Sequence, residues 1–273
     1  MSAQRPETEG TVTVATLRKW KRAGKRFVCL TAYDASFAAV LDRAEVDVIL
    51  VGDSLGMVVQ GHQTTVPVTM DHMVYHSQLV ARGCRRALLM ADMPFMSFAT
   101  PGQALDNAAR LMREGFAHVV KLEGGTEQVE TVRQLSCRGV PVCAHIGLQP
   151  QSIHKLGGYR VQGREQAQAQ AMVQDAGALE AAGAELLLLE CVPVGLARTI
   201  SQQLSIPVIG IGAGPHCDGQ ILVLHDLLGI TLGRRPRFAK DFLAEAGTVQ
   251  GAVETYAQAV RSGLFPAPEH CFE

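Results

Sequence analysis

The sequence has almost no net charge, few aromatic residues and no long apolar segment. Its 25 basic side chains nearly balance 26 acidic ones, for a formal net charge of -1, so bulk charge gives no attraction to nucleic acid or to an anionic membrane. No apolar run approaches the ~20 residues that cross a bilayer. The opening stretch, MSAQRPETEG, is polar and lacks the apolar core of a secretory signal. These absences predict a cytoplasmic protein with no nucleic-acid or membrane partner.

Cysteine is present but is not arranged for disulfides or zinc. The seven cysteines are scattered, odd in number and contain no Cys-X-X-Cys pair, and both Cys29 and Cys143 lie inside apolar runs. Disulfide frameworks and structural zinc sites need suitably spaced cysteines or a cluster of soft ligands. The pattern therefore predicts free, reduced thiols and argues against a zinc-stabilised fold.

Short apolar runs that alternate with helical stretches are abundant. With 273 residues, 47% of them hydrophobic, the chain can bury a large core. Stretches rich in Ala, Leu, Gln, Glu and Arg separate the runs, as at 102–115, 127–138 and 165–182, and several end in the glycine that commonly stops a helix. The runs that predict strands are 27–32, 46–51, 87–91, 118–122, 140–145, 185–190, 206–211 and 221–225.

Eight strand-and-helix repeats in about 250 residues are typical of one α/β architecture, the (β/α)8 TIM barrel. We predict a single TIM-barrel domain over 1–273, with residues 1–24 as an N-terminal extension and helix and residues 263–273 as a C-terminal tail. A last helix is predicted from Phe238 to Ser262. An open, doubly wound parallel sheet is the alternative architecture, because it contains the same alternation of elements.

Acidic residues stand where four of the predicted strands end. They are Asp53 in ILVGDS, Asp92 in LLMADMP, Glu123 in VVKLEGG and Glu190 in LLLLECVP. An unpaired carboxylate out of water is costly, and the strand ends of a TIM barrel open onto one face. Oxygen ligands from neighbouring strands suit Mg²⁺, so Asp53, Asp92 and Glu123 are predicted to contact one magnesium ion. The alternative is that each acid caps a helix or pairs with an arginine.

Three polar residues in these motifs have predicted roles of their own. Lys121 lies two positions before Glu123, on the same face of the strand, where it could neutralise an anionic substrate or form a structural ion pair. Glu190 ends a run of four leucines, and such burial raises a carboxylate pKa and favours a general acid or base, although a helix cap is the alternative. Ser54 could donate its hydroxyl to a ligand carboxylate or simply cap a turn.

Other segments give weaker indications. The long connection 52–86 contains HQTTVPVT and is a candidate lid or rim. The glycine-rich stretch 210–220 is either a phosphate site or a tight turn with close backbone packing. His145, His216 and His225 could transfer protons, but a lone histidine at a strand end more often makes a structural hydrogen bond, so no role is assigned to them.

Several long segments, taken in order, strongly resemble one enzyme family. They are VGDSLGMVVQGHQTT, ADMPFMSFATP, VKLEGG, VCAHIGLQPQS, GGYRVQGR, LLLLECVP and VIGIGAGPHCDGQILVLHD. The family is that of 3-methyl-2-oxobutanoate hydroxymethyltransferase, also called ketopantoate hydroxymethyltransferase. The resemblance runs from about Thr31 to the C-terminal tail. REGFAHVVKLEGG differs from the expected form by one extra residue near Phe116, before the strand that carries Lys121.

The resemblance implies a (β/α)8 barrel that acts in pantothenate and coenzyme A biosynthesis and forms a homodecamer in bacteria. It implies transfer of a hydroxymethyl group from 5,10-methylenetetrahydrofolate to 3-methyl-2-oxobutanoate, giving 2-dehydropantoate through an enolate that Mg²⁺ stabilises. The residues that the resemblance implies are Asp53, Asp92 and Glu123 at the metal, Asp53, Ser54, Asp92 and Lys121 at the keto acid, and Glu190 as the proton acceptor.

Two other readings of the same residues remain open. A barrel of the phosphoenolpyruvate mutase or isocitrate lyase type also combines Mg²⁺ with acids at strand ends, and it breaks C–C or P–C bonds. Such enzymes usually carry a catalytic cysteine or a phosphate grip, and the sequence has no motif of the KKCGH kind. A non-catalytic barrel that binds a metabolite is the second alternative, which a complete set of acids, lysine and base disfavours. Turnover of 3-methyl-2-oxobutanoate against phosphonopyruvate and isocitrate distinguishes the three.

Overall fold

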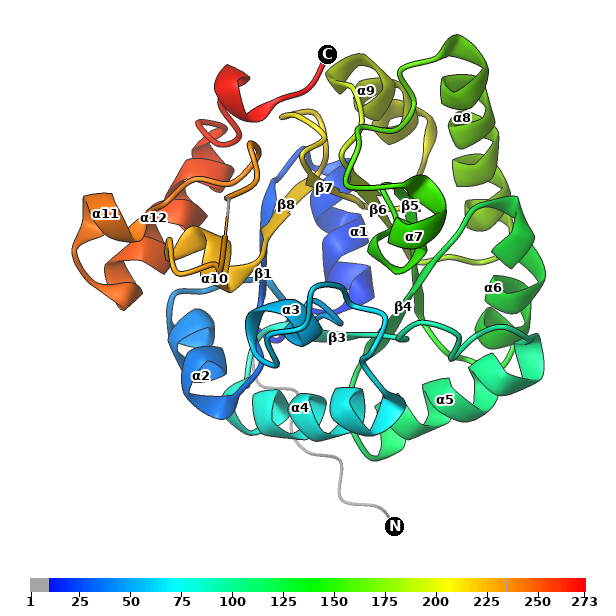
Figure 1. Cartoon of the computed structure of the whole chain (residues 1–273), viewed down its shortest axis with the longest axis horizontal. Helices are drawn as coiled ribbons and strands as arrows, with labels where there is room; N and C mark the ends of the chain where they lie inside the picture. The colour runs from blue at the N-terminus through cyan, green and yellow to red at the C-terminus, as the bar shows by residue number, and fades with distance from the viewer. Residues whose placement is uncertain (1–9, 234) are drawn as a thin grey trace.

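A closed barrel of eight parallel strands forms the centre of the protein (Figure 1). The computed structural model describes residues 10–233 and 235–273. Each strand pairs with its neighbours in chain order, and the first strand closes the barrel against the last. The predicted TIM barrel is therefore confirmed, and the open sheet is excluded. The strands are β1 (Phe27–Thr31), β2 (Val48–Val51), β3 (Leu88–Asp92), β4 (Val119–Glu123), β5 (Val142–Gly147), β6 (Leu186–Glu190), β7 (Val208–Ile211) and β8 (Gly219–Leu222).

Helices surround the barrel, and their starts follow from local sequence (Figure 1). Thr100 caps the helix that begins at Pro101, where the missing amide proton of proline costs nothing. Asp34 caps the next helix after β1 through the amide of Phe37. The helices are α1 (Val14–Arg22), α2 (Ala35–Arg43), α3 (Leu55–Val58), α4 (Met70–Gly83), α5 (Pro101–Arg113), α6 (Val129–Ser136), α7 (Ile153–Leu156), α8 (Gln166–Ala181), α9 (Val194–Gln203), α10 (Leu224–Leu227), α11 (Leu243–Ala246) and α12 (Val249–Ser262), with short 3-10 turns at Thr126–Gln128, Pro150–Ser152 and Pro268–His270.

Two apolar cores result from the alternation of side chains along the strands. Leu88 and Met90 belong to the core inside the barrel, whereas Leu89 and Ala91 belong to the core between the strands and the helices. Because both faces of every strand are covered, the strands are continuous apolar runs rather than alternating ones. The same alternation directs Asp92, two residues after Met90, toward the barrel interior.

Helix α1 packs against the barrel interior from the N-terminal side of the strands. Val12 and Leu17 are buried with the side chains of the inner core. Lys21 fixes the end of the helix, since its Nζ donates to Asp218 Oδ2 at 2.8 Å and to the Ser201 carbonyl at 2.9 Å. This helix lies within the predicted extension 1–24, of which residues 1–9 are outside the described part of the chain.

Most predicted strand ends differ from the structure by one or two residues, and two predicted elements differ more. The strand predicted at 221–225 is instead Gly219–Leu222, because the chain turns into α10, whose first amide, at Leu224, donates to the Thr31 hydroxyl at 2.9 Å. The helix predicted from Phe238 to Ser262 is divided. Gly247 ends α11 in the left-handed conformation, at φ 71°, and Thr248 then caps α12. The apolar periodicity crossed this break because both helices present apolar faces to the same core.

The structure also shows the state of the cysteines and the position of Phe116. All seven thiols are free, as predicted. Phe116 lies exposed in the turn between α5 and β4 with φ 60°, and β4 pairs with β3 from Val119 onward, so a residue added in this turn would leave Lys121 in place. Within residues 10–233 and 235–273, none of the helices has the length and apolar character needed to span a membrane.

Candidate active site

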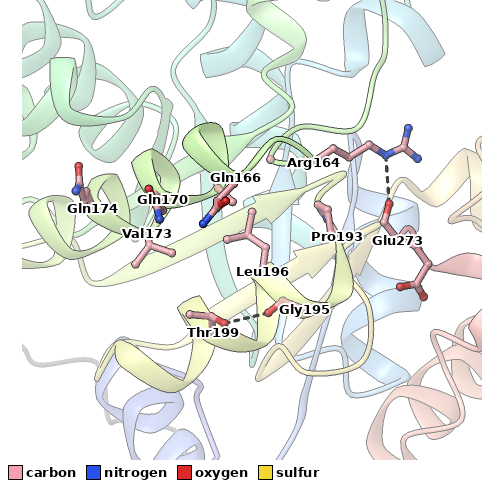
Figure 2. Close-up of a pocket in the computed structure, with 12 residues that line it drawn as sticks. Arg164, Gln166, Gln170, Val173, Gln174, Pro193, Gly195, Leu196, Thr199 and Glu273 are labelled. Carbon is pink, nitrogen blue, oxygen red and sulfur yellow. Dashed lines mark hydrogen bonds between the residues drawn. The ribbon is translucent and has the colours of Figure 1, made fainter.

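A cavity of about 490 Å³ opens at the C-terminal ends of the strands, and it contains every residue predicted for the site. Its size is in the range of small-molecule binding sites. A larger groove of about 770 Å³ lies elsewhere, between α8 and α9, and is lined by glutamines and apolar side chains rather than by clustered acids (Figure 2). The chemistry therefore belongs to the smaller cavity, whose lining includes Asp53, Ser54, Asp92, Lys121, Glu123 and Glu190.

The pairing of neighbouring strands places several of these residues side by side at the same height in the barrel. Asp92 on β3 is the partner of Lys121 on β4, and Glu123 on β4 is the partner of His145 on β5. Lys121 and Glu123 both point into the barrel, as their two-residue spacing predicted, because both contact His145 there. The inward positions of neighbouring parallel strands thus stack a cation, two carboxylates and an imidazole against one another.

Asp92 is the link between the second and fourth strands. Its Oδ2 accepts the backbone N–H of Asp53 at 3.1 Å, and its Oδ1 lies 3.0 Å from Lys121 Nζ. Burial acts to lower the pKa of Lys121, but the charges of Asp92, Glu123 and Asp53 more than offset it and raise that pKa above the usual value. Lys121 is therefore a permanent, buried ammonium group at neutral pH.

Gln151 is a site residue that sequence reasoning missed. Its side-chain Nε2 donates to Asp53 Oδ2 at 2.8 Å and to the Met93 carbonyl at 2.9 Å, while its backbone N–H donates to Glu123 Oε2 at 3.1 Å. One buried amide residue therefore fixes two of the predicted metal-binding carboxylates. The signal available in the sequence was its place in GLQPQS, directly after the strand that ends near His145.

His145 lies at the centre of the cluster and had no assigned role. Its Nδ1 is 3.2 Å from Lys121 Nζ and 3.6 Å from Glu123 Oε1, and its Nε2 is 3.4 Å from Glu190 Oε2. Burial, and then the positive charge of Lys121, lower its pKa well below the usual value. The imidazole is therefore neutral near pH 7 and connects Lys121 to Glu190 without adding charge.

Glu190 is the acid best suited to exchange a proton. Its side chain is 15% exposed, in contrast to 4% for Glu123, and that exposure faces the cavity. Burial raises its pKa to about 7, and the charge of Lys121 only partly opposes the shift. Both protonation states of Glu190 are thus populated near neutral pH, which is the property of an effective general acid or base.

Ser54 and Tyr33 form a hydroxyl pair beside Asp53. The Tyr33 and Ser54 oxygens are 2.8 Å apart, and burial raises the pKa of the Tyr33 phenol. Ser54 occupies the N-cap position of α3, but its hydroxyl makes no capping hydrogen bond and pairs with Tyr33 instead. Tyr33 was missed because it follows β1, where Asp34 was the more visible polar residue, and Asp34 caps α2.

The acids of the cavity carry an excess of negative charge that a cation would relieve. Four carboxylates, on Asp53, Asp92, Glu123 and Glu190, surround the single ammonium of Lys121. Burial, followed by the charge of Asp92, raises the pKa of Asp53 to about 7, and burial raises that of Glu123 well above its usual value. Both shifts express the cost of holding these carboxylates ionised together.

The residues present fit a magnesium ion held by few protein ligands. In the described part of the chain, no three His, Cys, Asp or Glu side chains already stand as a metal-binding group. Mg²⁺ is usually bound through one or two carboxylates, with water and substrate in the other positions. Asp53 and Asp92 supply two hard oxygen donors of that kind. The metal contacts of Asp53, Asp92 and Glu123 all stay predictions; the oxygens of Glu123 lie against Gln151 and His145.

Of the segments with weaker indications, the connection 52–86 lines the cavity, whereas the glycine-rich stretch and His216 have structural contacts. The connection 52–86 contributes Met57, Val58 and Thr65 to the cavity lining, so it forms part of the rim. The glycine-rich stretch allows close packing: a Cβ on Gly214 would lie 2.7 Å from a Val194 methyl. His216 pairs with Arg198 on the surface.

Comparison with known proteins agrees with the sequence resemblance. A family model described as ketopantoate hydroxymethyltransferase matches residues 11–268. A 3-methyl-2-oxobutanoate hydroxymethyltransferase of Alkalilimnicola ehrlichii is 64% identical over 98% of this chain and 96% of its own length. The enzyme of the same name from Halorhodospira halophila is 62% identical over 97% of this chain and 96% of its own length.

More distant similarity extends to solved structures that share the fold alone. A phosphonopyruvate hydrolase in complex with oxalate and Mg²⁺ aligns with a TM-score of 0.61 over 95% of this chain and 93% of its own, at 15% identity. A 2,3-dimethylmalate lyase of the phosphoenolpyruvate mutase/isocitrate lyase superfamily aligns with a TM-score of 0.57 over 77% of this chain and 80% of its own, at 18% identity.

Proposed function

The chain belongs to the ketopantoate hydroxymethyltransferase family, and from that membership we propose that it transfers a hydroxymethyl group from 5,10-methylenetetrahydrofolate to 3-methyl-2-oxobutanoate. The product is 2-dehydropantoate, so the protein acts in pantothenate biosynthesis, and we propose the cytoplasm as its compartment. The observation that carries the proposal is the cluster of Asp53, Asp92, Lys121 and Glu190 in one cavity of a chain whose relatives bear this enzyme name.

The inner end of the cavity is suited to a small anionic keto acid. Lys121 offers a fixed positive charge to the carboxylate or keto oxygen, and Ser54 offers a hydroxyl that already pairs with Tyr33. Asp53 and Asp92, with Glu123 behind them, would hold Mg²⁺. When bound, that ion supplies Lewis-acid polarisation of the keto acid, which makes the proton on C3 removable. The acids and Lys121 then serve both to bind the substrate and to orient it.

Glu190 is proposed to remove the C3 proton. Its carboxylate faces the cavity and its pKa of about 7 makes it a stronger base than an ordinary glutamate. The ammonium of Lys121 stabilises the negative charge that develops on the keto oxygen as the proton leaves. Both C–N bonds of the folate methylene group break as its carbon bonds to C3 and to the oxygen of one water molecule; the C3 proton and one water proton end on N5 and N10, and tetrahydrofolate leaves.

The function is tested by turnover and by a half-reaction. The protein should form 2-dehydropantoate from 3-methyl-2-oxobutanoate and 5,10-methylenetetrahydrofolate with Mg²⁺ present, and it should exchange the C3 proton of the keto acid with deuterated water without the folate. Turnover of phosphonopyruvate or isocitrate in place of this reaction would instead assign the chain to lyase chemistry. Binding of the keto acid with neither turnover nor exchange would indicate a non-catalytic barrel.

The family membership also leads us to propose a symmetric homodecamer. Sedimentation equilibrium at micromolar concentration should give a mass close to ten times that of the 29.3 kDa chain. A stable monomer under those conditions would contradict the proposal.

A further inference from the structure

The outer part of the cavity differs in charge from the inner part. Three arginines that line it, Arg160, Arg235 and Arg237, are exposed to solvent, and we call them the cationic rim. The acids Asp53 and Asp92 lie buried at the inner end. The cavity is therefore electrically polarised, negative at its inner end before a cation binds and positive at its entrance. A ligand with carboxylates at one end only would be oriented by this field with those carboxylates outward.

The cationic rim has unused hydrogen-bond donors. Arg237 uses its Nε to donate to the Glu269 carbonyl at 2.9 Å, which leaves the other donors of its guanidinium for a ligand. Arg235 makes a long ion pair, with 3.5 Å between its Nη1 and Asp241 Oδ2. For Arg160, the residues that the structure describes supply no side-chain partner. Such guanidinium groups suit carboxylates, which they can bind through two parallel hydrogen bonds.

An aromatic wall, composed of Tyr159, Phe238 and Phe272, lines the cavity together with the cationic rim. Gly212, at the end of β7, has φ 59°, and a Cβ there would lie 3.0 Å from Phe238 and 3.1 Å from Phe272. The absence of that side chain lets both rings close over the strand end. Arg237 lies over the Phe272 ring, with its Cζ 5.6 Å from the ring centroid, so the wall and the rim are joined.

Phe272 is held in place although it is the second-last residue. Its carbonyl accepts the Val194 N–H at 3.0 Å, and the next carbonyl, of Glu273, accepts Arg164 Nε at 3.2 Å (Figure 2). These bonds fix the C-terminal tail to the start of α9 and to the segment before α8. The tail is therefore a built part of the cavity wall, and the Phe272 ring is presented to the cavity by two backbone anchors.

We propose that the cationic rim and the aromatic wall form the subsite for the one-carbon donor, a reduced pterin joined through an aminobenzoyl ring to glutamate. The aromatic wall contacts the ring portion, and the cationic rim binds the glutamate carboxylates. The inference rests on the proposed function, because the folate is the second substrate there. The keto acid is assigned to Lys121 and Ser54 at the inner end, and the exposed rim arginines lie outside that set, so the rim is left for a second ligand with terminal negative charge.

The test compares two donors that differ only at the anionic end. One is 5,10-methylenetetrahydrofolate and the other is the primary amide of methylenetetrahydropteroate, called the pteroate below, which lacks glutamate and carries no carboxylate. Two variants remove arginines of the cationic rim. One is Arg237→Ala alone, and the other combines it with Arg160→Ala and Arg235→Ala. Each should raise the KM for the folate by about tenfold or more, as expected for loss of charge-assisted hydrogen bonds. The KM for the pteroate should be the same in these variants as in the wild type. Arg113→Ala, an exposed arginine at the end of α5, is the matched control and should leave both values unchanged.

Phe272→Leu tests the aromatic wall separately. It keeps an apolar side chain on the anchored tail but removes the ring, so the KM should rise for both donors, by a few-fold, while the KM for the keto acid stays the same. If the arginine variants changed the KM of the pteroate as much as that of the folate, or changed neither, the cationic rim would not bind the glutamate. If Phe272→Leu changed the KM of neither donor, the aromatic wall would not contact the ring portion.

Failure of the inference can be distinguished from failure of the proposed function. Direct binding of tetrahydrofolate, measured by calorimetry, needs no turnover and should weaken by the same factor in the arginine variants. Wild-type turnover with unaltered folate affinity in those variants would overturn the subsite and leave the function intact. Absence of turnover and of C3–H exchange in the wild type would overturn the function, whereas loss of tetrahydrofolate binding in the variants would still support the subsite.

Discussion

Replacing Glu190 by glutamine should stop removal of the C3 proton while leaving the cavity intact. Glutamine has nearly the same size as glutamate, but its amide is not a base. A positioned general base typically contributes ~10²–10⁴ to the rate, and Glu190 should lie in the upper half of that range. The reason is its pKa, which burial raises from the usual 4.5 to about 7 and which makes it a stronger base at the pH where it is still ionised.

The pH dependence of the wild-type reaction follows from the same pKa. The basic form of Glu190 is required, so the exchange rate should rise with pH and level off above about pH 7 to 8. At pH 6 only about one-tenth of the carboxyl groups are ionised, and the rate should be about one-tenth of its limit. In the variant this rise should disappear, leaving a slow exchange that does not change with pH over the same interval.

The assay is NMR detection of deuterium at C3 of 3-methyl-2-oxobutanoate, with Mg²⁺ and without folate. A raised folded-state pKa means that Glu190 destabilises the fold as the pH rises through 7, so Glu190→Gln should be as stable as the wild type or more stable at pH 8. Thermal unfolding at that pH checks that the variant is folded. Exchange at the wild-type rate in Glu190→Gln would refute the assignment and make His145 or a water molecule the next candidate base.

Three further changes have defined outcomes. Asp92→Asn should weaken Mg²⁺ binding in calorimetry by ~10-fold or more, because it removes one charged ligand beside Lys121, whereas the exposed Asp106→Asn should not. Gln151→Ala should raise the Mg²⁺ concentration for half-maximal turnover by about tenfold, since Asp53 loses its 2.8 Å hydrogen bond, and an unchanged value would show that the carboxylate is held by other contacts. Tyr256→Phe should lower the free energy of unfolding in urea by about 1–2 kcal/mol, because the single proton of the buried hydroxyl is shared between two strand carbonyls, at 3.0 and 2.9 Å. No loss would mean that this shared hydrogen bond contributes nothing net.

The barrel could be predicted from the sequence because each strand is short, apolar and covered on both faces. Six residues that line the cavity could also be predicted, because they lie in or next to apolar strands: Asp53, Ser54, Asp92, Lys121, Glu123 and Glu190. Asp53, Asp92 and Glu190 follow runs of apolar residues, so a charged side chain there is conspicuous in the sequence. The cavity placed these acids together because parallel strands of a barrel end on one face.

Residues that reach the site from loops could not be predicted in this way. Gln151 lies within the 3-10 turn Pro150–Ser152, and Phe272 comes from a tail that is distant in sequence from every strand. Their positions depend on long-range hydrogen bonds, such as that between Val194 and Phe272, which leave no periodic pattern in the chain. The division of the last helix was missed for a different reason, since Gly247 is a helix stop that the continuous apolar spacing concealed.

The anchored C-terminal tail has a practical consequence for handling the protein. Because Phe272 lines the entrance and Glu273 follows it directly, an affinity tag or fluorescent fusion added after Glu273 would start at the mouth of the cavity. Helix α1, in contrast, lies at the other end of the barrel, where its Leu17 and the preceding Val12 are buried in the inner core. Tags and surface attachment are therefore better placed at the N-terminal end. Attachment through the last residue would place the support at the entrance of the cavity.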